Sequence, residues 1–584
     1  MKRRVVLIVL LLAGCAALFE LQRSGATAPI TPRPLLYLLA DTQREAERIP
    51  LALTRVSDSE EMRVGEQIAR EDGWLEPHHP KEDEERITEH LNVAGRIVAL
   101  QVRRKAIRYH FFLRDDTNFV NAYAMPGGYI VVGRGLLELL ESEDELAAIL
   151  GHEIAHVDQR HAIERLQYDL ASKKVGMEGL YQLGRPVVEL FKAGYTKEQE
   201  LEADRVGLEF AVAAGYSPAG GVDVMKRFEK LESQYAHRAA SPIEEFAEVP
   251  LGALEEYFRS HPAASERRAA METEIAARHW NESIPVRPLA IRYIFLTDAA
   301  ERLARRGDFK ASMSRFEEAL KLNPNYVKAW RGLAEVSWRA ADGGETARAA
   351  TEAIRRSETG RDWELLARGL AVSNPQEGVN RLESLAKEAR PNGEPDSYIA
   401  ARTELAGFKF FRGNKEADED FQAALSFASQ PSEQARVRRE MAWWMYRSGK
   451  FKPAAEQLEA ARQVFPDSPE TALLLVWVLS DLGRQADAHQ MLSAAVTRDK
   501  DTGERRAVEG VLEWRTENKD SAKNQFREAA QTDPVWMSPH WVQNNYSPAA
   551  SGVIEQLQAI ENARRIKELK DRQRAMAGQP AHSQ

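Results

Sequence analysis

Hydrophobic positions recur at helical spacing over most of the chain. One stretch differs, because residues 109–116 and 119–135 are rich in aromatic and β-branched side chains and contain a Pro-Gly-Gly turn. The spacing therefore predicts a helical domain that contains a small sheet, followed from about residue 290 by an all-helical region. Within the first domain, the predicted helices include residues 57–71, 87–104 and 143–166.

The helical second half repeats itself with a period of 34 residues. Small and large core positions recur three times, as Ala454, Leu458 and Ala461, as Ala488, Leu492 and Ala495, and as Ala522, Phe526 and Ala529. Small residues let two helices approach, and large residues fill the space between them. The turn positions vary, and the register slips between residues 340 and 440. A period of this length, built from paired helices, is similar to the tetratricopeptide repeat.

Two histidines bracket a glutamate in the stretch GHEIAH, residues 151–156. On a helix, His152 and His156 lie on one face, where both imidazoles can reach one metal ion. Glu153 lies one step round the helix, where it can act on a water bound to that ion. His161 is nine residues from His152, which turns it towards the opposite side and predicts a surface or supporting residue rather than a ligand.

A His-Glu-x-x-His pentad also arises by chance, so a metal site needs a third ligand from elsewhere. In the stretch KEQELEADRVG, residues 197–207, Glu200 and Asp204 are again four positions apart. Glu200 would complete a site of two histidines and one glutamate, and Asp204 would hold the second ring nitrogen of a ligand histidine. Taken alone, the stretch is an acidic solvated helix face, since Glu198 and Glu202 are also present; the upstream pentad favours the metal site.

Three blocks in this half carry a family resemblance. In chain order they are NAYAMPGGYIVVGRGLLELL, SEDELAAILGHEIAHVDQRH and ELEADRVGLEFAVAAGY. Together they resemble, over roughly residues 55–270, the zinc metallopeptidases that include the CAAX prenyl protease and HtpX-like membrane proteases. With its repeats, the whole chain resembles the periplasmic subgroup of β-barrel assembly-enhancing proteases.

The resemblance implies the role of each candidate residue. One Zn²⁺ per chain would be held by the ligands His152, His156 and Glu200. Glu153 would be the general base, and Asp204 the aspartate that supports a ligand. These assignments fall on the residues that helical spacing already singles out.

Two weaker signals concern substrate and regulation. The block SHPAASERR, residues 260–268, matches the family, and in relatives with repeats such a histidine can close the metal's open position. His261 would then be regulatory, or else it simply begins a helix. Arg267 would stabilise an oxyanion, or brace the fold by pairing with an acid. Residues 119–124 would receive a substrate backbone by strand addition, or form a plain structural hairpin.

The start of the chain indicates export. MKRRVVLIVLLLAGCAALF has a basic beginning and a short apolar run, which is typical of a signal peptide. The run ends in Leu-Ala-Gly-Cys, which resembles a bacterial lipobox, so Cys15 would be acylated. Cys15 is the only cysteine of the chain. Ala16 in the next position favours the outer membrane. The alternative is an uncleaved signal anchor with a chance cysteine.

The overall charge excludes one class of partner. A net charge of −9 over 584 residues is mild and gives no sign of the basic face that a nucleic-acid-binding protein usually shows. We therefore expect protein partners and, through the lipid anchor, a membrane.

These observations predict a mainly α protein, in which an α+β zincin-type metallopeptidase domain precedes an α-solenoid of tetratricopeptide repeats. The boundaries that we expect are a lipoprotein signal peptide at 1–15, a tether at 16–54, the peptidase at 55–285, the repeats at 286–545 and a charged helical or disordered tail at 546–584.

The expected function is that of a zinc endopeptidase in the periplasm, anchored by lipid to the outer membrane. It would cut misfolded or stalled envelope proteins, and its repeats would recruit substrates or the outer-membrane assembly machinery. The alternative is a repeat-based chaperone or scaffold whose peptidase domain is largely autoinhibited.

Overall fold

The computed structural model describes residues 56–172, 195–240, 263–281, 284–357, 359–388, 395–495 and 502–577. These residues form two compact units, divided between Arg292 and Tyr293. None of the helices in the described ranges combines the length and the apolar character needed to cross a membrane. Cys15 and His261 lie outside the described residues, so the roles expected of them stay predictions.

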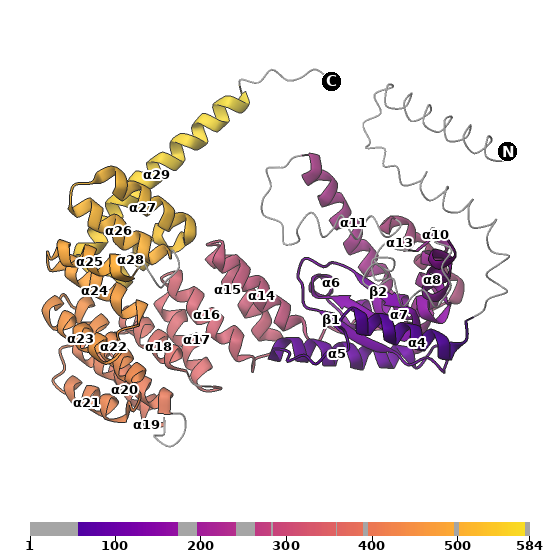
Figure 1. Cartoon of the computed structure of the whole chain (residues 1–584), viewed down its shortest axis with the longest axis horizontal. Helices are drawn as coiled ribbons and strands as arrows, with labels where there is room; N and C mark the ends of the chain where they lie inside the picture. Colours follow the sequence, from indigo (N-terminus) through magenta and orange to yellow (C-terminus); the bar gives the residue numbers. More distant parts are fainter. Residues whose placement is uncertain are drawn as a thin grey trace. The chain divides into compact units, whose positions relative to one another are not determined.

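The first unit combines helices with one short sheet (Figure 1). Its elements are α4 (Asp58–Glu71), α5 (Glu82–Ala99), β1 (His110–Arg114), β2 (Ala122–Met125), the 3-10 turn η1 (Pro126–Gly128), β3 (Tyr129–Gly133), α6 (Arg134–Leu139), α7 (Glu143–Asp158), α8 (His161–Ser172), α10 (Lys197–Ala213), α11 (Ala219–Ala240) and α13 (Ala264–Arg278).

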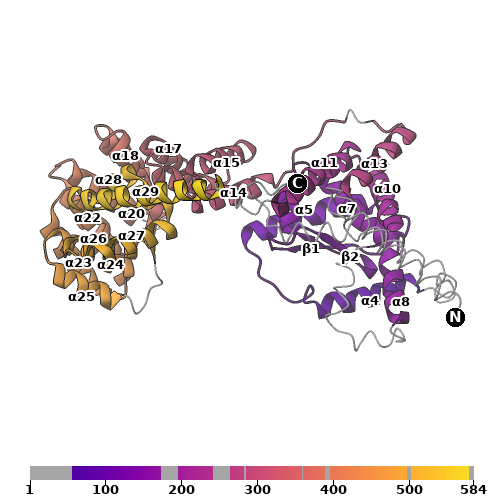
Figure 2. The same cartoon turned by 90° about the horizontal axis from the view of Figure 1, so that it is seen from above.

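The sheet has the order β1-β3-β2, with β1 parallel and β2 antiparallel to the central strand β3. Helices α5 and α7 lie along one face and α4 and α8 along the other (Figure 2). Every residue of β3 is buried, as expected for a strand that is covered on both faces. The predicted small sheet within a helical domain is confirmed, and β2 forms one of its edges.

Helix α5 lies five residues earlier than the spacing predicted. Four acidic residues occupy its first turn, where they stabilise the partial positive charge of the helix N-terminus. After Leu100 the chain leaves the helix, and the carboxylate of Asp158 accepts the backbone N–H groups of Arg103 and Arg104 at 3.0 and 2.8 Å. This long-range cap is not visible in the local hydrophobic pattern.

The predicted single helix over residues 143–166 is wrong, because the chain turns sharply after α7. Helix α7 begins with a capping box between Ser142 and Glu145 and ends at Asp158. Arg160 then adopts the left-handed conformation with φ of 67°, and α8 starts at His161. The turn brings His161 back towards α7 instead of carrying it to the far side.

Helices α7 and α10 touch through their backbones. A Cβ atom added to Gly207 would lie 2.5 Å from the backbone nitrogen of His152, and one added to Gly151 would lie 2.4 Å from the carbonyl oxygen of Gly207. Only glycine fits at both positions. The contact allows side chains from the two helices to meet within hydrogen-bond distance.

The second unit is a series of helix pairs, which confirms the predicted paired helices. They are α14 (Arg292–Arg305), α15 (Phe309–Leu322), α16 (Val327–Arg339), α17 (Gly343–Ile354), α18 (Gly360–Ser373), α19 (Gly378–Glu388), α20 (Pro395–Phe411), α21 (Ala417–Phe427), α22 (Pro431–Arg447), α23 (Phe451–Val464), α24 (Pro469–Asp481), α25 (Gln485–Ala495), α26 (Gly503–Arg515) and α27 (Lys519–Thr532). The 3-10 turn η3 (Pro534–Met537), α28 (Pro539–Asn545) and α29 (Pro548–Ala577) follow.

One backbone feature repeats with the pairs. A residue with positive φ follows the end of the first helix in six of them, at Gly307, Ala341, Gly413, Gly449, Gly483 and Glu517. The last three are 34 residues apart and keep φ between 67° and 76°, although the third is a glutamate. The pair α18–α19 lies between Ala341 and Gly413, where the sequence register slips. Helix α29 continues to Ala577, so the charged tail is helical as far as that residue.

The contact between α7 and α10 predicts the effect of one substitution. Gly207→Ala should push the two helices apart and lower the free energy of unfolding of the first unit by about 1–3 kcal/mol, as overpacking does in other cores. Hydrogen exchange of the α7 and α10 amides in the full chain measures this loss. Gly552→Ala on α29, where an added Cβ meets nothing within 4 Å, is the control and should not destabilise its helix. Unchanged protection in Gly207→Ala would contradict the proposed role of the contact.

Candidate metal centre

Three buried side chains from α7 and α10 converge on one point. The Nε2 atoms of His152 and His156 lie 3.1 Å apart. The carboxylate oxygens of Glu200 lie 3.5 Å from Nε2 of His152 and 3.7 Å from Nε2 of His156. One potential ligand atom from each of the three residues falls within 4.8 Å of the others. The structure thus brings together the three residues that the sequence predicts as ligands.

The other ring nitrogen of His152 is held by an acid. Its Nδ1 lies 2.8 Å from Oδ1 of Asp204, so a proton on Nδ1 leaves the Nε2 lone pair directed towards Glu200. Arg267 on α13 binds Asp204 with two hydrogen bonds, of 2.8 Å from Nε and 2.6 Å from Nη2. Burial opposes ionisation of Asp204, but the guanidinium of Arg267 holds its pKa below the ordinary value.

Of the two roles predicted for Arg267, the geometry matches the pairing with an acid. Its side chain is only 3% exposed, and both of its hydrogen bonds to Asp204 direct it at that carboxylate. A guanidinium held in this bidentate way fixes the orientation of its partner. Nη2 of Arg267 also lies 3.2 Å from Nδ1 of His152, so the guanidinium contacts both the acid and the imidazole that the acid holds.

The second histidine has a different partner. Nδ1 of His156 lies 3.0 Å from Nδ1 of His161, and Nε2 of His161 lies 3.4 Å from a carboxylate oxygen of Glu202. If His156 binds a cation through Nε2, its Nδ1–H donates to His161, which in turn donates to Glu202. Of the two positions predicted for His161, the surface one is wrong, since the residue is 3% exposed.

Tyr195, which the sequence did not single out, covers this side of the centre. Its ring stacks on His156 with centroids 3.8 Å apart and an interplanar angle of 17°. Its hydroxyl donates to the carbonyl oxygen of Ala124 in the edge strand β2, at 3.1 Å. Tyr195 precedes the N-cap Thr196 of α10, and neither periodicity nor motif spacing points to it.

Glu153 is buried beside the three converging residues. It is 4% exposed, and burial raises its pKa to about 7, although the neighbouring charge of His152 opposes the shift. A carboxyl group with this pKa can gain or lose a proton near neutral pH. Burial lowers the pKa of His152, but its hydrogen bonds to Asp204 and Glu200 reverse this effect and raise it to about 9.

The donor set fits a metal cation. Two imidazole nitrogens and a carboxylate are the ligands of many catalytic zinc sites, which keep a further position open. The imidazole nitrogens face each other at 3.1 Å with the carboxylate beside them, and one divalent cation would satisfy all three. The second ring nitrogen of each histidine already has a partner, as the supporting residues of metal ligands usually provide.

Comparison with known proteins agrees with this geometry. Residues 80–275 match the family described as Peptidase family M48, and residues 445–510 match the tetratricopeptide repeat. The first range contains all the residues of the candidate centre described above. The chain therefore has a metallopeptidase domain, whose family depends on a metal, and a repeat region.

Curated relatives share one or both parts. The Beta-barrel assembly-enhancing protease of Escherichia coli (strain K12) is 25% identical over 362 residues, which are 58% of this chain and 68% of the relative. Metalloprotease LoiP of the same strain is 26% identical over 203 residues, or 33% of this chain and 70% of the relative. Mitochondrial metalloendopeptidase OMA1 of Arabidopsis thaliana is 30% identical over 154 residues, or 25% and 28%.

Among solved structures, a tetratricopeptide repeat protein from Parabacteroides merdae is similar to 46% of this chain, and the match covers 98% of that protein. The sequence identity is 15% and the TM-score 0.29.

The supporting role of Asp204 predicts the behaviour of one variant. Asp204→Asn keeps the size of the side chain but turns an NH₂ group towards Arg267 and removes the charge that orients His152. We expect zinc affinity to fall about 10–100-fold, which is the usual effect of losing such a partner. Titration of the metal-free full chain with zinc measures it.

The matched control removes a carboxylate elsewhere on α10. Glu209→Gln lies on the same helix, where Glu209 faces Arg103 and Arg278 and is 31% exposed. The zinc affinity of the Glu209→Gln variant should equal that of the parent chain. Equal affinity in Asp204→Asn and the parent would show that Asp204 does not support the centre.

Proposed function

We propose, from the premise that this chain joins a peptidase family M48 domain to tetratricopeptide repeats, that it is a zinc-dependent endopeptidase of the bacterial cell envelope. Its substrates would be misfolded or stalled envelope proteins, and the repeats would recruit these proteins or an outer-membrane assembly machine. The observation that supports the proposal best is the convergence of His152, His156 and Glu200 beside the buried Glu153. The name of the relative in Escherichia coli supports the envelope setting.

The reaction would be hydrolysis of a peptide bond. When bound at His152, His156 and Glu200, the metal supplies Lewis-acid polarisation of the scissile carbonyl and makes water more acidic. Glu153 takes a proton from the attacking water while the oxygen of that water bonds to the carbonyl carbon. It then gives that proton to the amide nitrogen as the C–N bond breaks, which releases a carboxyl group and an amine.

The surrounding residues hold the reacting groups in place. Asp204 fixes the tautomer of His152, and Arg267 fixes Asp204. His161 does the same for His156. Because these residues are buried, the interactions act away from bulk water, where they are stronger than on the surface.

Strand β2 is the element where a substrate backbone would bind. It is an edge strand, and an extended peptide can add to such an edge through backbone hydrogen bonds. The hydroxyl of Tyr195 already donates to the Ala124 carbonyl of this strand. Tyr195 thus already uses one acceptor position of a carbonyl to which an added substrate strand could bind.

The same contact favours the second candidate function, a repeat-based chaperone or scaffold with a largely autoinhibited peptidase. Tyr195 stacks on His156, and the residues of the centre are at most about 5% exposed. A centre closed in this way would cut only after a partner or substrate opens it. The two candidates differ in whether the isolated chain cleaves protein.

We also propose that the chain is exported and anchored by a lipid at Cys15. The lipobox at the end of the basic and apolar leader supports this location, and Ala16 supports the outer membrane as the destination.

The role of Glu153 gives the most direct test of the enzyme. Glu153→Gln should keep zinc at one ion per chain but lower the cleavage of an unfolded protein by about 10²–10⁴-fold, because it removes the group that transfers the proton. Zinc content by elemental analysis and cleavage by gel electrophoresis measure the two effects.

The matched control is Glu198→Gln, an exposed acid in the first turn of α10, which should cleave like the parent. Equal cleavage by Glu153→Gln and the parent would contradict the assignment of the base. Zinc without cleavage in any of the three proteins would favour the scaffold, and a chain that binds no zinc would exclude the metal centre.

Anchoring has its own test. Cys15→Ser should remove the protein from the outer-membrane fraction, because it removes the side chain that would be acylated. Ser24→Ala, a change in the proposed tether, should leave the distribution as it was. If Cys15→Ser fractionates like the parent, the lipid anchor is wrong, whereas the peptidase assignment is untouched.

A further inference from the structure

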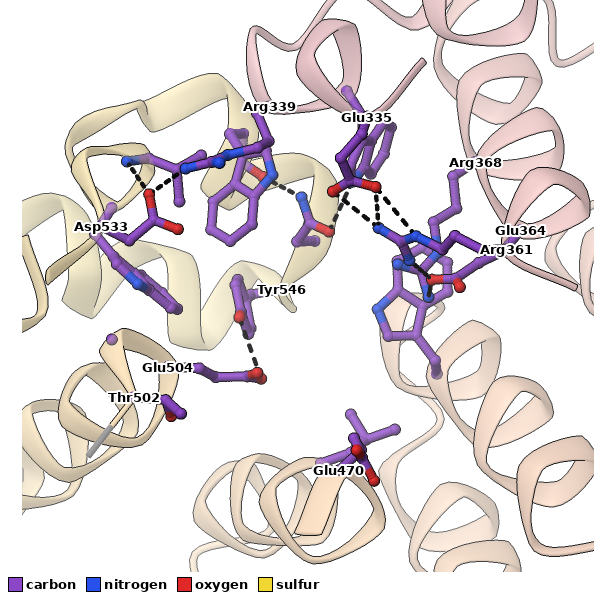
Figure 3. A pocket seen from close by; sticks show the side chains of 18 of the residues that line it. Glu335, Arg339, Arg361, Glu364, Arg368, Glu470, Thr502, Glu504, Asp533 and Tyr546 are labelled. Carbon is purple, nitrogen blue, oxygen red and sulfur yellow. Dashed lines mark hydrogen bonds and ion pairs between the residues drawn. The ribbon is translucent and has the colours of Figure 1, made fainter. Parts of the chain in front are cut away.

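The repeat unit encloses a pocket of about 520 Å³. Residues 533–546, which form η3 and α28 with their flanks, contact helices from earlier repeats. The indole N–H of Trp338 on α16 donates to Asn545 at 3.2 Å, and Arg339 forms an ion pair with Asp533. Arg447 on α22 donates to the carbonyl oxygen of Tyr546 at 3.1 Å. These contacts close the inner surface of the repeats into a pocket (Figure 3).

One wall of the pocket is aromatic. Trp536, Trp541 and Tyr546 form a cluster whose ring centroids lie 5.3–5.9 Å apart. On α22, Trp443 also lines the pocket, and the guanidinium of Arg368 stacks on its ring at 3.9 Å. Aromatic faces attract cations, and tryptophan does so most strongly.

Carboxylates outnumber basic groups around the pocket. The lining contains Glu335, Glu364, Glu440, Glu470, Glu504 and Asp533 but only four arginines, Arg339, Arg361, Arg368 and Arg439. Counted as formal charges, six carboxylates and four guanidinium groups leave an excess of two negative charges. The pocket lining contains no lysine or histidine.

The arginines are already bound to acids of the lining. Arg361 forms ion pairs with Glu335 and Glu364, and Arg339 pairs with Asp533. Arg368 pairs with Glu364 and Glu440, and Arg439 pairs with Glu440 at 2.7 Å. An anionic ligand would have to compete with these carboxylates for each guanidinium.

Two acids are less committed. Glu470 is 68% exposed, lies 3.8 Å from Arg439, at the limit of an ion pair, and accepts a hydrogen bond of 3.0 Å from the hydroxyl of Ser468. Glu504 accepts a hydrogen bond of 3.4 Å from the hydroxyl of Tyr546. Glu504 is an exposed residue, so a bound cation can reach it. Figure 3 shows Glu470 and Glu504 on two sides of the same space.

The lining also contains two N–H groups that could donate a hydrogen bond to a bound ligand. Nε of Arg368, whose residue is 9% exposed, and Nε1 of Trp541 reach no acceptor among the described residues. Buried donors of this kind usually find a partner. A carbonyl oxygen of a bound chain would supply one after a small movement of either side chain.

We propose that this pocket binds an extended protein segment through an arginine or lysine side chain, placed between Glu470 and Glu504 and against the aromatic cluster. The inference deepens the recruiting role of the repeats proposed above and rests on it. It gives the class of partner as a basic, unfolded or extended chain. An acidic segment would be repelled by the excess of carboxylates. It would also find each arginine of the lining already paired with an acid.

The test uses the full chain with Glu153→Gln, so that the probe is not cut. The probe is a short fluorescent peptide of glycine and serine with two arginines, and its binding is followed by anisotropy. Replacing both acids, in Glu470→Gln with Glu504→Gln, should weaken binding at least about tenfold, because it removes the two charges that face the cation. A peptide with glutamates in place of the arginines should not bind.

The matched control removes two exposed acids of the same unit outside the pocket lining. Glu459→Gln with Asp520→Asn makes the same change of net charge, at side chains that are 52% and 93% exposed. It should bind the peptide like the parent. Equal weakening in both pairs would mean that only the overall charge matters and would overturn the proposal, as would equal or tighter binding of the acidic peptide.

Two further measurements separate this inference from folding and from the peptidase. Glu470→Gln alone, at an acid that is 68% exposed, should fold like the parent and still weaken binding; unchanged binding overturns the proposal. With Glu153 intact, the double pocket variant should cut a substrate without basic residues as fast as the parent chain. If the chain binds the peptide but never cleaves protein, the enzyme proposal is wrong and the pocket proposal stands. If it cleaves protein but does not bind the peptide, the pocket proposal is wrong and the enzyme proposal stands.

Discussion

The candidate centre depends on the backbone contact between α7 and α10. Gly151 and Gly207 let the helices approach until an added Cβ on either residue would overlap the opposite backbone. His152 follows Gly151 directly, and Asp204 lies one helical turn before Gly207. At this separation the acids of α10 reach the imidazoles of α7, so the distance between two helices determines whether the motif residues form a site.

Much of the centre could nevertheless be predicted from the sequence. Positions four apart lie on one helix face whatever the surrounding fold, so His152 with His156, and Glu200 with Asp204, could be paired from their spacing alone. The resemblance to a peptidase family then joined the two pairs. His161 could not be placed in this way, because α7 ends at Asp158 and the chain then turns at Arg160, whose left-handed conformation has no signal in the residue type. Tyr195 reaches His156 only through the tertiary fold.

The repeat unit shows a similar division. The 34-residue period predicted the helix pairs because small and large core positions must alternate wherever two helices pack. The turn residues look irregular in sequence, yet Glu517 adopts the same left-handed conformation as Gly449 and Gly483. The period carries no information on what lies against the inner surface. Residues 533–546 close that surface through long-range contacts with α16 and α22, and the pocket they form has a charge that the net charge of the chain does not reveal.

The central claim is that His152, His156 and Glu200 bind one metal ion. X-ray absorption spectroscopy of the zinc-loaded full chain, compared with Glu200→Gln, measures the ligands of the ion directly. The account predicts two histidine nitrogens at roughly 2.0–2.1 Å and oxygen ligands, one of which is lost or displaced in Glu200→Gln. A spectrum without histidine scattering, or one that Glu200→Gln leaves unchanged, would contradict it.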